Sequence, residues 1–376
     1  MRALVVGGGI GGLTAAAALR QAGVDTVVLE RARALEAVGA GIALASNGLR
    51  AFDRLGIGRA VREAGAVGAG VVVRRPDGSV LLDAPFRADW MEIVGIRRAA
   101  LQSILLAAAG EGVVELGAEC TGFRAERNRV TALLADGAEE SGDLLVGADG
   151  IRSAVRARLH GEGAPLYAGY AAWRAIVRPP DGTVEPRTFS ETWGPGMRFG
   201  IVDVGSGFVY WFVSENAPLD APAPHGGAKA AFLERFRDWH APIPALIEAT
   251  DGQEITRTGV FDRKPLRRWG EGRVTLLGDA AHPMTPNVGQ GAGQAIEDAI
   301  VLADCLAGAE DVPATLRRYE RKRMRRTAGI VRLSRRLGRL AQAESRAGCL
   351  VRDTLIGHTP VRVQRRQQER LLAYEP

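Results

Sequence analysis

The first thirty residues restrict this chain to a small group of folds. Residues 2–6 form a short apolar run, the next six residues include five glycines, and an alanine-rich helical pattern then ends at Gly23. A second apolar run occupies residues 26–30. A strand, a glycine turn, a helix and a second strand in this order predict a βαβ unit, because parallel strands need a crossover connection between them. The sequence therefore predicts an α/β fold.

The glycine turn has the spacing of a dinucleotide site. Gly7, Gly9 and Gly12 permit a tight turn, a close approach of the backbone to a pyrophosphate, and close packing of helix on strand. The helix that follows offers unpaired N–H groups to phosphates. Glu30 ends the second apolar run, where a carboxylate can accept hydrogen bonds from an adenosine ribose. Glycines alone do not distinguish FAD from NAD, so an NAD-dependent dehydrogenase stays an alternative at this point.

Two later segments also place a carboxylate after a buried-strand pattern. GADGIRSAVR contains Asp149 and Gly150, and GDAAHPMTPNVGQGAGQ contains Asp279 and leads into a predicted helix over 291–306. Small residues around each aspartate let a ligand lie against the backbone. Either aspartate alone could be a helix cap. Two such segments beside a nucleotide-binding unit favour ligand binding.

Together these segments resemble the DG and GD motifs of class A FAD-dependent monooxygenases, the para-hydroxybenzoate hydroxylase-like aromatic hydroxylases. The resemblance runs from the first strand to the helix near residue 345. It implies an α/β protein with a Rossmann-type FAD-binding domain, an inserted antiparallel-sheet substrate domain and a C-terminal helix. The implied boundaries are 1–72, 96–165 and 266–345 for the discontinuous FAD-binding domain, 73–95 and 166–265 for the substrate domain, and 346–376 for a helical tail.

The resemblance also implies a set of FAD contacts. Glu30 would lie on the adenosine ribose, Arg98 on the phosphate and ribityl portion, and Asp279 on the ribityl or pyrophosphate region. Asp149 matches a carboxylate tied to both FAD and the nicotinamide donor, and Gly39–Ile42 match the loop beside the flavin ring. The cofactor-binding residues expected on this basis are Gly7, Gly9, Gly11, Gly12, Glu30, Arg31, Gly41, Ile42, Arg98, Asp149, Gly150, Asp279, Pro286, Gly289, Gly291 and Ala292.

The middle of the chain has a different character. Residues 167–258 hold four tryptophans, several Pro and Gly turns and the run FVYWFV, which predict an antiparallel sheet with one covered face. Strand alternation places Phe208, Tyr210 and Phe212 on one face of the sheet and Trp211 on the other.

Four residues are expected to be catalytic: Arg198, Tyr210, Pro286 and Asn287. A hairpin around a Ser-Gly turn would bring the strands of Arg198 and Tyr210 together, and this cation and phenol could hold an ionised aromatic substrate. The alternative is a solvated Arg198 and a packed Tyr210. Pro286 and Asn287 match the stretch along the flavin ring, and an Asn at 287, where urate hydroxylases carry an acid, argues against urate. His282 could be a base, but we favour a packed role.

The resemblance implies an enzyme, a single-component NAD(P)H-dependent flavoprotein monooxygenase. NADPH or NADH would reduce bound FAD, O2 would add to give a C4a-hydroperoxide, and this species would hydroxylate a phenolic or N-heteroaromatic small molecule. An epoxidase or Baeyer–Villiger oxygenase on the same fold, a flavin-dependent reductase, and a non-catalytic nucleotide-binding module stay open as alternatives.

Charge is unevenly distributed along the chain. From Pro313 onward there are 17 Lys and Arg residues against 5 Asp and Glu, so the preceding residues carry a net negative charge. An apolar pattern at helical spacing predicts an amphipathic helix with a solvated arginine face that includes Arg325 and Arg326. That pattern is formed by Leu316, Tyr319, Ile330, Ser334, Leu337 and Leu340. The cations do not alternate with aromatic residues in the pattern of a nucleic-acid-binding segment, so nucleic acid is not an expected partner.

The remaining composition sets broad limits. Three distant cysteines predict inert thiols and no metal site. No apolar run approaches the roughly 20 residues of a membrane-spanning helix, and no signal-peptide pattern is present. We expect a cytoplasmic monomer or homodimer that binds a small aromatic substrate and O2.

Overall fold

The computed structural model describes residues 1–35, 40–86, 91–222 and 224–375. Its first layer is a five-stranded, fully parallel sheet in the order β18-β12-β1-β2-β8. The strands are β1 (Arg2–Val6), β2 (Asp25–Glu30), β8 (Val114–Leu116), β12 (Leu144–Gly147) and β18 (Val274–Leu276). The central strands β1 and β12 are almost entirely apolar and buried, because a parallel sheet is covered on both faces. The predicted βαβ opening is confirmed.

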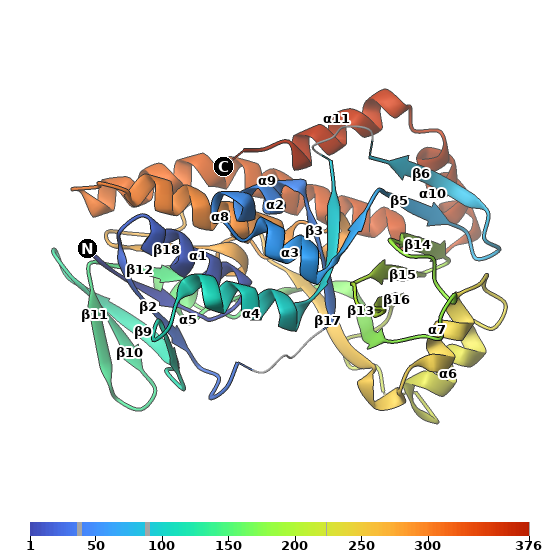
Figure 1. Ribbon diagram of the computed structural model, residues 1–376, viewed down its shortest axis with the longest axis horizontal. Coiled ribbons are helices and arrows are strands. Elements are labelled where there is room, and N and C mark those ends of the chain that lie inside the picture. Colours follow the sequence, from blue (N-terminus) through green and yellow to red (C-terminus); the bar gives the residue numbers. More distant parts are fainter. Residues whose placement is uncertain (36–39, 87–90, 223, 376) are drawn as a thin grey trace.

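Helices cover this sheet and complete the larger core (Figure 1). α1 packs against both α4 and α8, and α9 packs against α8. These helices are α1 (Ile10–Gln21), α4 (Arg98–Ala109), α8 (Gly291–Leu306) and α9 (Val312–Ala341). Strand β18 and helix α8 join this layer only after the chain has formed a second sheet, so the first unit is interrupted and then completed, as the sequence predicts.

The second sheet has seven strands in the order β17-β13-β16-β15-β14-β5-β6 and is antiparallel except for the β14–β5 pair. Its strands are β5 (Gly70–Arg74), β6 (Val80–Pro85), β13 (Leu166–Val177), β14 (Phe189–Gly194), β15 (Met197–Asp203), β16 (Val209–Asn216) and β17 (Thr256–Asp262). Helices α6 (Gly227–Arg235) and α7 (Ile243–Ala249) cover one face. We call the opposite face the inner face. The expected fold class is confirmed.

The strand register confirms the predicted sidedness of FVYWFV. The Tyr210 and Phe212 rings lie 5.9 Å apart on the inner face, and Trp211 stacks on Phe199 at 5.3 Å on the helix-covered face. Strands β15 and β16 form the predicted hairpin, but Arg198 pairs with Ser214 rather than with Tyr210. Arg198 and Tyr210 therefore share a face without being direct cross-strand neighbours.

Two three-stranded sheets complete the strands. One sheet has the order β3 (Gly41–Ala45), β7 (Ile93–Arg97), β4 (Ala66–Gly68). The other has the order β11 (Glu139–Gly142), β10 (Val130–Leu134), β9 (Cys120–Ala125). Asp136 and Gly137 form a tight turn. That turn joins β10 to β11, where Asp136 accepts a hydrogen bond from the Ala138 N–H at 2.9 Å and Gly137 adopts φ +88°. Shorter helices are α2 (Ser46–Arg54), α3 (Gly58–Ala64) and α5 (Ala154–His160).

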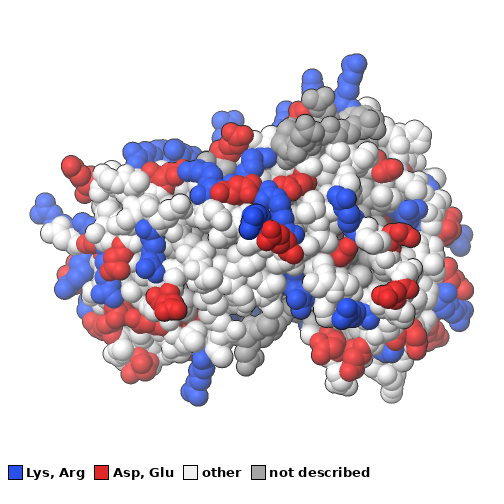
Figure 2. Space-filling view, viewed as in Figure 1, with Lys and Arg blue, Asp and Glu red and all other residues white. Residues whose placement is uncertain are grey.

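Helix α9 is amphipathic, and α10 (Arg346–Gly357) and α11 (Val361–Leu372) follow it. Leu316, Tyr319, Ile330 and Ser334 are buried, but Leu337 is 37% exposed and its neighbour Gly338 faces the core instead. The predicted apolar stripe is therefore wrong at Leu337. Figure 2 shows blue side chains along the upper left edge of the molecule, over α9. No helix in the described part of the chain is long and apolar enough to cross a bilayer.

Candidate active site

The glycine turn after β1 leaves the start of α1 accessible. Gly7 has φ +108°, and a Cβ on Gly12 would lie 1.9 Å from the Gly7 carbonyl oxygen, so both positions require glycine. A Cβ on Gly9 would meet nothing within 4 Å, whereas one on Gly11 would lie 2.9 Å from the Leu277 side chain. The first turn of α1 contains no acidic residue, and no side chain caps it. Its N–H groups and positive dipole end are available to an anion.

Glu30 is fixed beside this turn by the main chain. Its Oε2 accepts a hydrogen bond from the Gly8 N–H at 2.6 Å, and its Oε1 accepts one from the Ala32 N–H at 2.8 Å. Each carboxylate oxygen keeps a free lone pair for a ribose hydroxyl. The neighbouring Arg31 is exposed.

Asp149 both caps a helix and leaves one oxygen free. Its Oδ2 accepts from the Ala154 and Val155 N–H groups at 2.7 and 3.2 Å, at the start of α5. Its Oδ1 is buried and has no hydrogen-bond partner among the described residues. Burial raises the pKa of Asp149, and hydrogen bonds from Ser153 and the backbone partly offset this. A buried acceptor without a donor predicts a ligand hydroxyl or N–H at this point. Gly150, with φ +77°, turns the chain beside it.

The two aspartate segments are joined by a buried arginine. Arg156, at the end of GADGIRSAVR, donates to the carbonyls of Ala280 and Ala281 at 3.0 and 3.1 Å. Burial lowers its pKa to about 10. The DG and GD segments therefore form one structure at the carboxyl ends of β12 and β18, the edge at which open α/β sheets bind ligands.

Asp279 and Arg98 lie within electrostatic reach of each other. Asp279, in the 3-10 helix η2 (Gly278–Ala280), has an accessible side chain, yet the surrounding protein raises its pKa, and the charges of His282 and Arg98 partly offset this. Arg98 begins α4 and is exposed, and its guanidinium makes no hydrogen bond to a residue in the described part of the chain.

Strand β3 brings the predicted flavin loop to the seven-stranded sheet. A Cβ on Gly41 would lie 2.5 Å from the Cβ of Tyr210, so glycine allows this close approach. Ile42 is half-buried and pairs with Ile96 of β7. Gly39, the first residue of the predicted GAGI loop, lies outside the described residues.

Asn287 connects several elements through its amide. It lies in the 3-10 helix η3 (Pro286–Val288), and its Oδ1 accepts from Arg198 Nη2 at 2.7 Å. Its Nδ2 donates to the Tyr170 hydroxyl at 2.9 Å, and it also reaches Thr285 and the Ser334 carbonyl. The segment around it is accessible: Pro286 and Gly289 are exposed, Gly289 has φ +60°, and Gly291 and Ala292 open α8.

Arg198 is not a solvated strand residue. It is 2% exposed, and besides Asn287 it donates to Gln342 Oε1 at 2.9 Å and to Glu191 Oε2 at 3.2 Å. Tyr210 is also buried, and this raises its pKa. The sequence interpretation missed Glu191. The only local sequence signal for Glu191 is strand alternation, which places it on the same face of its strand as Trp193, two residues later.

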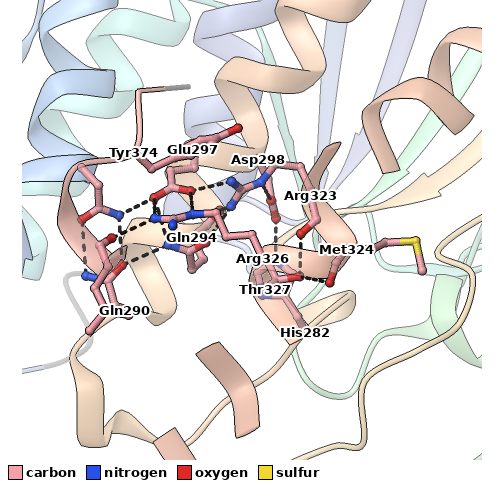
Figure 3. A network of polar contacts seen from close by, with 12 residues as sticks. His282, Gln290, Gln294, Glu297, Asp298, Arg323, Met324, Arg326, Thr327 and Tyr374 are labelled. Carbon is pink, nitrogen blue, oxygen red and sulfur yellow. Dashed lines mark hydrogen bonds and ion pairs between the residues drawn. The ribbon is translucent and has the colours of Figure 1, made fainter. Parts of the chain in front are cut away.

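Behind these segments lies a buried network of charges (Figure 3). Glu297 and Asp298 of α8 and Arg323 of α9 are 0% exposed, and Arg323 pairs with both carboxylates. Arg326 donates to Glu297 at 2.8 Å through both Nε and Nη2, with its side chain only 15% exposed. The prediction that Arg326 lies on the solvated face is therefore wrong, because Glu297 draws it inward. Arg325 is exposed, as predicted.

His282 belongs to this network. Its Nε2 lies 2.5 Å from Asp298 Oδ2, its ring is 2% exposed, and it packs against Trp269 at 5.3 Å. This geometry agrees with the packed role and gives no support to a base that meets substrate. Among the described residues, no group of His, Cys, Asp and Glu side chains has the arrangement of a metal site.

Comparisons with known proteins agree with this geometry. A family model described as FAD binding domain matches residues 1–334. The chain is 46% identical over 357 residues to the aurachin C monooxygenase/isomerase of Stigmatella aurantiaca, covering 94% of this chain and 93% of the relative. It is 36% identical over 365 residues to the 3-amino-4-hydroxybenzoate 2-monooxygenase of Streptomyces cremeus, covering 94% and 91%.

Solved structures give the same result. The structure of Klebsiella pneumoniae HpxO complexed with FAD and uric acid has a TM-score of 0.90 to this fold at 30% sequence identity. The match covers 99% of this chain and 97% of that chain.

Proposed function

The chain belongs to the class A FAD-dependent monooxygenases, and on that premise we propose that it hydroxylates a phenolic or N-heteroaromatic small molecule, with NADPH or NADH and O2 as co-substrates. It is a flavoprotein oxidoreductase, and FAD rather than NAD is its resident nucleotide. The observation that carries the residue assignments is the joining of the DG and GD segments by Arg156, which brings together the partnerless Asp149 Oδ1 and the accessible Asp279.

The residues present fit FAD. The accessible first turn of α1 suits the pyrophosphate, and Glu30 suits the adenosine ribose. The partnerless Asp149 Oδ1 and the accessible pair of Arg98 and Asp279 supply a further acceptor, a cation and a carboxylate. Bound FAD takes reducing equivalents from NAD(P)H and activates O2, so the protein has to position the ring and exclude water.

We place the aromatic substrate between the inner face and the η3 segment. Tyr210 and Phe212 offer aromatic walls there. Arg198 and Asn287 fix the inner face to η3 by their direct hydrogen bond of 2.7 Å. We assign Arg198, Tyr210, Pro286 and Asn287 to substrate positioning. Asn287 in particular does not act as an acid or a base, because its amide does not ionise at ordinary pH.

Product analysis tests this function. Purified protein with bound FAD should oxidise NADPH or NADH and consume O2 faster when an accepted aromatic ring is present. The product should gain one oxygen atom as an aromatic hydroxyl. A panel of phenols and quinolones, together with aurachin C, is the first set of substrates to test. An epoxide or a ring-inserted ester would support the other oxygenase outcomes, and anaerobic conversion to a saturated product would support a reductase.

We also propose the domain division 1–72, 96–165 and 266–345 against 73–95 and 166–265, with 346–376 as a tail. Separate apolar cores beneath the two large sheets support a division into two units. The bounds at 72/73 and 95/96 need to move to 69/70 and 92/93, because otherwise they cut through β5 and β7. We further propose a cytoplasmic monomer or homodimer without a nucleic-acid partner. The described cysteines are all free thiols, which suits a reducing compartment. Gel filtration with light scattering tests the oligomeric state.

A further inference from the structure

Glu191 of β14 lies on the inner face beside the proposed substrate region. In the β14–β15 pair, Glu191 is opposite Gly200 and Trp193 is opposite Arg198. Directly opposed residues of antiparallel strands point to the same face of the sheet, so Glu191 shares the face of Arg198. The intervening Thr192 points to the other side, where its hydroxyl lies 2.8 Å from His240 Nε2.

Glu191, rather than Arg198, is the accessible charge at this place. The Arg198 side chain is 3% exposed and contacts three acceptors, whereas the Glu191 side chain is 28% exposed. Glu191 Oε2 accepts hydrogen bonds from Trp193 Nε1 at 2.7 Å and from Arg198 at 3.2 Å. Its Oε1 accepts no hydrogen bond from any residue that the structure describes. The carboxylate is thus held rigidly by one oxygen and offers the other.

The surroundings of Glu191 suit an aromatic ring. Gly200 has no side chain, and a Cβ there would lie 2.1 Å from Cε1 of Phe212, so the Phe212 ring lies over Gly200 next to Glu191. The positive charge of Arg198 is already balanced by Glu191 at 3.2 Å. A second cation of this face, Arg174, lies opposite Phe212 and donates to Thr258. An anionic ring placed directly beside Glu191 would be repelled by its carboxylate, because Arg198 is already paired.

We propose that Glu191 is a substrate-recognition residue and that it selects a neutral aromatic ring bearing an N–H or O–H donor over a ring with its own anionic group. A carboxylate can only accept hydrogen bonds, so it binds a ring that carries an N–H or O–H donor and repels a ring that carries a negative charge. A donor hydrogen-bonded to a carboxylate also pushes electron density into its ring, which favours electrophilic hydroxylation without prior ionisation. This inference rests on the proposed function and narrows its substrate class. It differs from the sequence-based hypothesis of an ionised substrate held by Arg198.

Three small rings test it by perturbation of the flavin absorption spectrum. 4-Quinolone is neutral with an N–H donor, 1-methyl-4-quinolone lacks the donor, and 4-hydroxybenzoate is an anion. Wild-type holoenzyme should bind 4-quinolone roughly 10- to 100-fold more tightly than either other ring, the range of a hydrogen bond to a charged group. Glu191→Gln should lose most of that preference, leave 1-methyl-4-quinolone unchanged and bind 4-hydroxybenzoate more tightly.

Glu185→Gln is the matched control, because Glu185 is an exposed carboxylate in the loop before β14. It should keep all three dissociation constants. Unchanged preferences in Glu191→Gln, tightest wild-type binding of 4-hydroxybenzoate, or no spectral response to any ring would each overturn the inference. FAD content and NAD(P)H-dependent O2 consumption are measured on the same samples. A protein without bound FAD, or without NAD(P)H-dependent O2 consumption, would contradict the proposed function itself. An active flavoprotein whose ring preferences do not change in Glu191→Gln would contradict only the inference.

Discussion

At the scale of single residues, Asp279 and Arg98 give the most direct test of the proposed FAD contacts. Both are accessible, and the charge of Arg98 acts on the carboxylate of Asp279. A charge-assisted hydrogen bond contributes roughly 1.5–3 kcal/mol. Asp279→Ala or Arg98→Ala should therefore weaken FAD binding by about one to two decades, measured by quenching of flavin fluorescence. Asp220→Ala and Arg127→Ala, at exposed positions elsewhere, are controls. Equal flavin retention in all four variants would contradict the assignment.

Arg198 and Tyr210 can be tested without loss of FAD. Arg198 ties β15 to Glu191, Asn287 and Gln342, so its removal should loosen the substrate region and leave the flavin site intact. Arg198→Ala should raise KM and divert NAD(P)H to hydrogen peroxide at normal FAD content, and Tyr210→Phe should show a milder form. Arg198→Lys should recover little, because an ammonium cannot reproduce the planar fork. Wild-type coupling and KM in these variants would limit both residues to a structural role.

Local sequence could predict the glycine turn, Glu30, Asp149 and Asp279, because each follows a strand pattern directly in the chain. The partners of Arg198 could not be predicted in this way. Glu191, Asn287 and Gln342 reach it from three separate elements. Such contacts depend on strand register and helix docking, neither of which is specified by a local pattern.

At the scale of elements, α9 carries two adjacent arginines with opposite surroundings. Arg326 pairs with the buried Glu297, whereas Arg325 is exposed. Without Arg326, the two buried carboxylates Glu297 and Asp298 share the single guanidinium of Arg323, so Arg326→Gln should lower the free energy of unfolding by roughly 2–4 kcal/mol. Arg325→Gln should change it by less than about 0.5 kcal/mol. Urea unfolding of both variants makes the comparison, and similar stabilities would show that the pair contributes little.

The bounds of the helices could be predicted from the sequence better than the side chains that each helix turns inward. The predicted helix over 291–306 coincides with α8, and α4 also follows an apolar pattern at helical spacing. Their ends are marked by sequence signals, such as Gly110 after α4. The inward orientation of the Arg326 side chain has no such local signal, since it depends on the carboxylate of Glu297, 29 residues away. Hydrophobic periodicity finds the buried face of a helix but not the polar groups drawn in beside it.

At the scale of the whole molecule, one buried network links distant parts of the chain (Figure 3). His282 follows β18, Glu297 and Asp298 lie in α8, and Arg323 lies in α9. Tyr374 near the C terminus covers the network, with its ring 4.4 Å from the Arg326 guanidinium. Arg326 also donates to the Arg370 and Leu371 carbonyls at 2.9 and 2.8 Å. The family resemblance predicts this fold, but the docking of the last helix depends on these contacts.

Asp298 should make the stability of the whole molecule sensitive to acid. Burial opposes its ionisation, but His282 and Arg323 outweigh burial and hold the pKa of Asp298 below its usual value. A depressed pKa in the folded state stabilises the fold above the unfolded-state pKa, which is about 4, and that contribution is lost as pH falls through the folded-state value. Asp298→Asn should cost roughly 3 kcal/mol at pH 7, because it leaves Arg323 and Arg326 to share the single carboxylate of Glu297.

The difference between wild type and Asp298→Asn should therefore be constant from pH 7 to about 5 and shrink below about pH 4. Urea unfolding across this range measures it. Asp220→Asn, at an exposed position, should follow wild type at every pH. A difference that persists undiminished at pH 3 would show that the asparagine variant fails through lost packing or geometry. A difference that grows toward low pH would mean that the pKa of Asp298 is raised, which would place the stabilising charge of this network elsewhere.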